Sequence, residues 1–158
     1  MHPPSEFISR VESGDLTIGV IGLGYVGLPT AIGFHDSGFN VWGVDVSKRT
    51  VEMILEGKNP TGDPDIDDIV PPSGTARWGI TSSSLLAVPH CDVVLVTVPT
   101  PITPDLKPDL SYVEAAGRDV FGSIQPGSNT IVVLESTVYP GVTSQVWMPI
   151  IEELGLNI

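Results

Sequence analysis

Cysteine is almost absent from the sequence, and other scarcities narrow the possible functions further. With Cys91 alone among 158 residues, the chain can form neither an internal disulfide nor a zinc site built from cysteines. Seven Lys and Arg stand against 19 Asp and Glu, a net charge of −12. Because such a chain repels polyphosphates, we expect no nucleic-acid partner. The sequence has no apolar run near the about 20 residues of a membrane span and no signal-peptide pattern, so we expect a cytoplasmic protein without a membrane partner.

The residues that are present indicate a globular fold with many tight turns. Gly (17) and Pro (15) are frequent, yet the hydrophobic content of 41% is too high for a disordered chain. Cys91 precedes a run of Val and Leu, where we expect an inert, buried thiol. The acidic stretch 63–67 is similar to the start of a calcium loop, but Asp68 and Gly74 stand where that loop needs Gly and Glu. We therefore expect no metal site.

Short apolar runs alternate along the chain with segments of helical periodicity. Strands are expected at residues 16–21, 41–44, 78–81, 92–98 and 130–134. Helices are expected at residues 26–37, 47–57, 83–87 and 143–154, and one more is expected to begin at a capping box, Ser111 to Glu114. This alternation predicts an α/β fold, a Rossmann-like doubly wound parallel sheet in three α/β/α layers. We expect one domain over residues 1–158, with an ordered core at about 16–156, forming the N-terminal fragment of a longer enzyme.

The sharpest motif is Gly22-Leu23-Gly24-Tyr25-Val26-Gly27, which follows an expected strand and opens an expected helix. In that context G-x-G-x-x-G predicts a dinucleotide site: the first Gly permits the turn, the second lets the backbone approach a pyrophosphate, and the third lets helix and strand pack closely. Free amides at the helix start would hold the phosphates. A purely structural strand-to-helix turn is the alternative.

Asp45 stands at the end of the second expected strand, 18 residues after Gly27. A carboxylate there can accept both hydroxyls of an adenosine ribose and would repel a 2′-phosphate, which favours NAD over NADP. We expect Val46 beside it to contact the cofactor as well. Lys48 and Arg49 follow closely and leave NADP open.

Three stretches in order resemble the UDP-glucose/GDP-mannose dehydrogenase family. Residues 22–29, Gly-Leu-Gly-Tyr-Val-Gly-Leu-Pro, resemble the opening of that family. Val98-Pro99-Thr100-Pro101, followed by Pro-Asp-Leu-Ser at 108–111, resembles its fourth strand and Pro-rich loop. Leu-Glu-Ser-Thr-Val-Tyr-Pro-Gly at 134–141 resembles its fifth-strand turn and looks closest to the branch that oxidises UDP-N-acetylhexosamines. The resemblance extends from about residue 16 to residue 156.

The resemblance implies a nucleotide-sugar 6-dehydrogenase. Such enzymes oxidise the C6 alcohol of a UDP-sugar to the uronic acid with two NAD, through a thiohemiacetal and a thioester on a catalytic cysteine. That cysteine, a lysine and the sugar-binding part belong to later regions of the family chain, and Cys91 does not match the cysteine's position. The resemblance therefore implies an inactive fragment, a monomer or weak dimer, of an enzyme that is a homodimer at full length.

Several site residues follow from the resemblance alone. Val98, Pro99 and Thr100 would lie beside the pyrophosphate or the nicotinamide ribose, although Pro99 and Pro101 could simply shape a loop. Ser136 and Thr137 would lie near the nicotinamide. Thr137 is the candidate catalytic residue, on the side of the water that hydrolyses the thioester, and Glu135 is a second candidate.

Two features of these stretches allow a second interpretation. Ser136 and Thr137 could instead form a hydroxyl turn that caps the last helix. Five residues after the aspartate the family often has a basic residue; this chain has Thr50, and Arg49 is the expected substitute.

Two other functions are compatible with the glycine motif. A stand-alone NAD-sensing module would need no catalytic partner domain, but it would not need the Pro-Thr-Pro loop or the Glu-Ser-Thr turn. A β-hydroxyacid-type dehydrogenase would usually carry Met inside the glycine loop, where this chain has Tyr25 and Val26.

Overall fold

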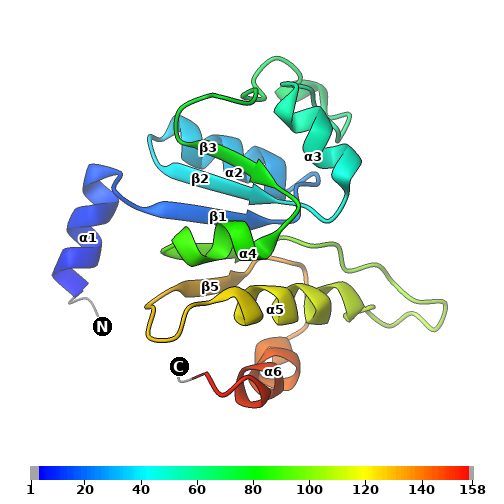
Figure 1. Cartoon of the computed structure of the whole chain (residues 1–158). Coiled ribbons are helices and arrows are strands. Elements are labelled where there is room, and N and C mark those ends of the chain that lie inside the picture. Colours follow the sequence, from blue (N-terminus) through cyan, green and yellow to red (C-terminus); the bar gives the residue numbers. More distant parts are fainter. Residues whose placement is uncertain (1–3, 157–158) are drawn as a thin grey trace.

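A single parallel sheet forms the centre of the molecule (Figure 1). The computed structural model describes residues 4–156. The strands are β1 (Thr17–Ile21), β2 (Asn40–Val44), β3 (Trp78–Thr81), β4 (Val93–Val96) and β5 (Ile131–Leu134). They lie in the order β3-β2-β1-β4-β5, and all neighbouring pairs are parallel. This order confirms the Rossmann-like α/β fold.

Helices cover both faces of the sheet and complete the three layers (Figure 1). The helices are α1 (Pro4–Ser13), α2 (Gly27–Asp36), α3 (Lys48–Leu55), α4 (Ser84–Ala87), α5 (Ser111–Ser123) and α6 (Met148–Glu153). One buried hydrophobic cluster joins α2 and α3 to the sheet, and a second joins α4, α5 and α6 to the other face. The core is therefore two apolar layers with the sheet between them.

Two expectations about helix starts have different outcomes. Ser47 caps α3 as the sequence predicts, because its side chain accepts a hydrogen bond from the Thr50 amide. The predicted capping box is wrong: Ser111 is already the first helical residue, Leu110 precedes it, and no side chain caps the helix. The Asp109 carboxylate accepts the Ser111 amide instead, at 2.9 Å. Hydrogen bonding from the Ser111 side chain, and then from its amide, lowers the pKa of Asp109.

The helix α1 was not predicted. It lies at the amino ends of the strands, on the side of the molecule opposite the long loop that follows β4 (Figure 1). A cavity of about 1130 Å³ opens on the same side, between α1, the start of β5 and the helices α5 and α6. The glycine motif follows β1 and so lies at the opposite, carboxyl ends of the strands.

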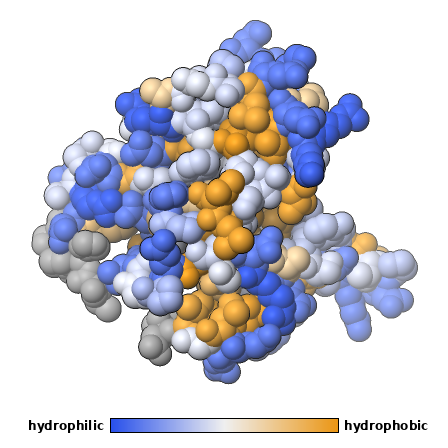
Figure 2. Space-filling model, viewed as in Figure 1, coloured by the Kyte–Doolittle hydropathy of each residue, from blue (hydrophilic) through white to orange (hydrophobic). Residues whose placement is uncertain are grey.

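The face in Figure 2 shows hydrophobic side chains gathered over its middle, where Figure 1 places α4. Leu85 and Leu86 of this short helix are exposed. Within residues 4–156, no helix combines the length and apolarity needed to cross a membrane.

Candidate cofactor site

The sheet has one topological switch point, between β1 and β4. The chain leaves β1 toward α2 on one face and leaves β4 toward α5 on the other, so the loops after these neighbouring strands diverge. In open α/β sheets the crevice between such loops, outside the carboxyl ends of the strands, is where ligands bind. The glycine motif follows β1, and Val98, Pro99 and Thr100 follow β4. The structure therefore brings these two predicted groups to one crevice.

The three motif glycines have the geometry that the sequence predicts for them. Gly22 has a φ of 92°, and a Cβ there would lie 3.2 Å from the carbonyl of Thr97. A Cβ on Gly27 would collide with the carbonyl oxygen of Gly22. A Cβ on Gly24 would meet no atom within 4 Å, so the space before this residue is open. The backbone at Gly24 can thus be approached closely by a ligand.

The residues just before α2 carry unpaired backbone amides. Within the described part of the chain, the amides of Gly24, Tyr25 and Val26 donate to no acceptor, and no side chain caps the helix. Free N–H groups at a helix start carry the positive end of the helix dipole and bind anions. Tyr25 and Val26 are exposed beside them, whereas the side chain of Leu23 is only 1% exposed and belongs to the core. A diphosphate fits this arrangement.

Asp45 links the end of β2 to the glycine loop. Its Oδ2 accepts the Leu23 amide at 2.8 Å and its Oδ1 accepts the Ser47 amide at 2.9 Å. The two bonds fix the orientation of a half-buried carboxylate, and each oxygen keeps a second lone pair that can accept a hydroxyl. Val46 is 85% exposed next to it. Arg49 is exposed in the first turn of α3.

The turn after β5 is tied to the loop after β4. The Ser136 hydroxyl donates to the Val98 carbonyl at 2.7 Å, and the Thr100 hydroxyl donates to the Thr137 carbonyl at 2.9 Å. The alternative that Ser136 and Thr137 cap the last helix is wrong, because the residue preceding its first turn is Val142 and no side chain caps it. The side chains of Glu135 and Thr137 are exposed.

Thr97 is a residue of this region that sequence reasoning missed. It directly follows β4, and its hydroxyl lies 2.7 Å from the carbonyl oxygen of Gly22 and 3.0 Å from that of Ile21. No signal in the sequence marks it, because a Thr after Val93-Val94-Leu95-Val96 looks like one more β-branched strand residue.

Cys91 lies away from the crevice, just before the amino end of β4. Its thiol is buried and donates to the Ala87 carbonyl at 3.3 Å. Burial, with a smaller contribution from the charge of Asp92, raises the pKa of Cys91 to about 12. This agrees with an inert thiol. Among residues 4–156 there is no group of three or more metal-binding side chains.

Comparisons with known proteins point to one family. The model of the NAD binding domain of the UDP-glucose/GDP-mannose dehydrogenase family matches residues 16–157. An NDP-N-acetyl-D-galactosaminuronic acid dehydrogenase from Ralstonia nicotianae is 39% identical over 132 residues, which are 82% of this chain and 29% of the relative. A UDP-N-acetyl-D-mannosamine dehydrogenase from Escherichia coli is 38% identical over 129 residues, 82% of this chain and 30% of the relative.

A solved structure shows the same similarity. The UDP-D-ManNAc dehydrogenase from Pyrococcus horikoshii matches with a TM-score of 0.80 and 33% identity, over 90% of this chain and 34% of that one. The chain thus spans about 30% of the length of the curated relatives it matches.

Proposed function

The chain belongs to the UDP-glucose/GDP-mannose dehydrogenase family, as its NAD-binding domain, and from this we propose how the crevice holds the cofactor and which reaction it serves. The open backbone at Gly24 and the free amides of Gly24, Tyr25 and Val26 would hold the pyrophosphate. The Asp45 carboxylate would accept the hydroxyls of the adenosine ribose. The single observation that carries the proposal is the fixed Asp45 carboxylate beside these unpaired amides.

The remaining contacts follow from the position of each residue around the crevice. Val46 and Arg49 flank Asp45 and would lie at the adenosine, while the main chain of Leu23 and the side chains of Tyr25 and Val26 would border the pyrophosphate. Val98, Pro99 and Thr100 would face the nicotinamide ribose, with Ser136 and Thr137 on its far side. We propose Thr137, and secondarily Glu135, as residues that face the reacting end of the cofactor; both side chains are exposed.

The proposed reaction is the oxidation of the C6 alcohol of a UDP-N-acetylhexosamine to the uronic acid with two NAD. Bound NAD would supply the hydride acceptor in each of the two oxidation steps, and water would supply the second oxygen of the carboxylate. This chain would contribute by binding and orienting the dinucleotide: the glycine loop fixes the pyrophosphate, and the Thr100–Thr137 hydrogen bond keeps the two loops around the nicotinamide together. The sugar and the catalytic cysteine would be held by regions of the family chain that these 158 residues do not contain, so we propose that the chain alone is inactive.

The assembly and the location are proposals of the same kind. We propose a homodimer for the complete enzyme, a monomer or weak dimer for this chain, and a cytoplasmic setting. The setting rests on the single buried thiol, which needs no oxidising compartment.

Nucleotide titration tests the cofactor site. NADH and NADPH are titrated separately into the purified chain, with tryptophan quenching as the readout. We expect saturable binding that is tighter for NADH, and Asp45→Ala should weaken NADH binding at least about tenfold because two hydrogen bonds to a carboxylate are lost. The affinity for NADPH should fall less, since its 2′-phosphate no longer faces that charge.

Asp68→Ala is the matched control, because Asp68 is an exposed acidic residue outside the crevice. It should leave both affinities unchanged. Failure of the wild-type chain to bind either nucleotide, or equal losses in the two variants, would overturn the proposed site.

A further inference from the structure

The peptide group between Gly22 and Leu23 is held at both of its ends. Its carbonyl oxygen, on Gly22, accepts the hydroxyl of Thr97 at 2.7 Å. Its amide, on Leu23, donates to Oδ2 of Asp45 at 2.8 Å. The plane of this one peptide therefore depends on two side chains that come from different strands, one following β4 and one following β2.

The hydroxyl of Thr97 is the specific anchor of the carbonyl. Its other close neighbour, the Ile21 carbonyl, already accepts the Thr97 amide at 2.9 Å within the sheet ladder. A hydroxyl has a single proton, and the shorter of its two contacts is the one to Gly22. Within the described part of the chain, the Gly22 carbonyl has no other donor.

The fit also depends on Gly27. A Cβ on this glycine would lie 2.5 Å from the Thr97 hydroxyl oxygen. The third glycine of the motif thus leaves the space that the hydroxyl occupies, and the hydroxyl fills it with a polar atom aimed at the first glycine.

We propose that Thr97 is a positioning residue that orients the glycine loop and, through the Gly22–Leu23 peptide, the carboxylate of Asp45. The inference rests on the proposed function of the crevice. A glycine backbone has little intrinsic preference for one peptide orientation, because both signs of φ are accessible to it. Without the Thr97 hydroxyl, the Gly22 carbonyl is free to rotate, and the Leu23 amide then leaves Asp45. The ribose and the pyrophosphate lose their alignment together.

Three variants separate this role from general packing. Thr97→Val replaces the hydroxyl by a methyl group of similar size, and Thr97→Ser keeps the hydroxyl. Thr17→Val makes the same change at the start of β1, at the amino end of the strands and away from the glycine loop. The Thr17 hydroxyl has no hydrogen bond within the described residues. The dissociation constants of NADH and NADPH are measured for each variant.

We expect Thr97→Val to raise the dissociation constant of NADH about fivefold, the effect of one lost hydrogen bond. The dissociation constant of NADPH should rise less, so the preference for NADH narrows because Asp45 is no longer held in place. Thr97→Ser and Thr17→Val should remain within about twofold of the wild type. If Thr97 had a purely structural role, its loss would weaken the binding of both nucleotides equally, and the ratio of the two dissociation constants would not change.

Amide hydrogen exchange of Leu23, followed by NMR without nucleotide, decides the case independently of cofactor binding. Exchange should be accelerated in Thr97→Val and unchanged in Thr97→Ser and Thr17→Val. A wild-type chain that binds neither nucleotide would overturn the proposed function, while the Leu23 exchange would still report on Thr97. The inference would be overturned if the Leu23 amide exchanged at the same rate in Thr97→Val and Thr97→Ser. It would also be overturned if Thr97→Val left the ratio of the NADH and NADPH dissociation constants unchanged.

Discussion

At the scale of single residues, burial decides what Cys91 can do. Its folded-state pKa of about 12 lies above the ordinary value of 9.0, so the folded chain keeps a proton that the unfolded chain loses. The stability that this provides is complete below pH 9 and is lost as the pH rises toward 12, by about 1.4 kcal/mol per pH unit. The Cys91 thiol should therefore lower the free energy of unfolding, measured with urea, by about 2 kcal/mol at pH 10.5 relative to pH 8.

Cys91→Ala isolates that contribution. The variant lacks the thiol but keeps every Tyr and Lys that titrates in the same range, so its stability should fall less over the same interval. Parallel pH profiles for the variant and the wild type would contradict a buried, protonated thiol.

The residues of the crevice differ in how far the sequence could predict them. The positions of Gly22, Gly27 and Asp45 follow from the local requirements of a strand-turn-helix unit, and the structure shows the close approach at both glycines and the bond from the Leu23 amide to Asp45. Thr97 and Ser136 act on carbonyls that are 75 and 38 residues away in the chain. Because their partners come from neighbouring strands, only the sheet order reveals the two contacts.

At the scale of elements, the alternation of strands and helices was predictable because short apolar runs, of which β4 is the most continuous, alternate with segments of helical periodicity. The last helix departs from the regular form expected at residues 143–154. A π-helical turn at Thr143–Trp147 precedes α6, and Pro149 stands in the first turn of α6. Proline lacks the N–H for a regular i to i−4 bond, and the wider turn accommodates this. The turn also directs Trp147 onto α5, where its indole donates to the Val113 carbonyl at 3.0 Å.

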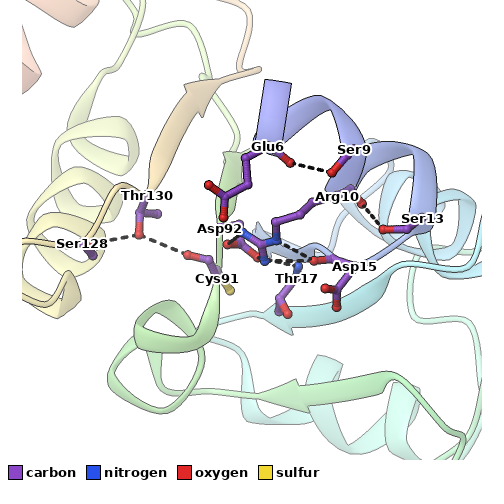
Figure 3. Close-up of polar contacts among 10 residues, drawn as sticks. All are labelled: Glu6, Ser9, Arg10, Ser13, Asp15, Thr17, Cys91, Asp92, Ser128 and Thr130. Carbon is purple, nitrogen blue, oxygen red and sulfur yellow. Dashed lines mark hydrogen bonds and ion pairs between the residues drawn. The ribbon is translucent and has the colours of Figure 1, made fainter. Parts of the chain in front are cut away.

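The helix α1 precedes the residues that match the family, and an ion pair between Arg10 and Asp92 attaches it to the strands (Figure 3). The Arg10 guanidinium donates two hydrogen bonds to Asp92, at 2.7 and 2.9 Å, and two more to the Asp15 carbonyl. Asp92 also accepts the Thr17 amide at 2.9 Å. The pair therefore joins α1 to the amino ends of β1 and β4. The sequence did not predict α1, because its attachment depends on a residue 82 positions later.

Arg10→Met should lower the free energy of unfolding by about 1–2 kcal/mol, since a two-pronged, half-buried guanidinium pair is stronger than a surface pair. Urea denaturation of the purified chain measures this. Arg49→Met is the matched control, because Arg49 is exposed and forms no ion pair within the described residues, and it should stay within about 0.5 kcal/mol. An Arg10 variant as stable as this control would mean that α1 is held by Phe7 and its apolar contacts alone.

At the scale of the whole molecule, the two edges of the sheet carry different features. The carboxyl edge bears the glycine loop, Asp45 and the two linked loops, whereas the amino edge bears α1 and the cavity of about 1130 Å³. The large cavity is therefore separate from the proposed cofactor crevice, whose residues do not line it. Volume alone would point to the amino ends of the strands, whereas the topology points to their carboxyl ends, where we propose the cofactor site.

The net charge of −12 opposes the approach of a dinucleotide that is itself anionic. The local amides act only at contact distance, so long-range repulsion should limit the rate of association. The electrostatic screening length falls from about 30 Å at 0.01 M salt to about 8 Å at 0.15 M. Stopped-flow measurements over this range should show the association rate constant of NADH rising severalfold. Adenosine, which is uncharged, should show no such rise. A rate constant that falls with salt would mean that Lys48 and Arg49, exposed in the first turn of α3, outweigh the acidic surface at the crevice.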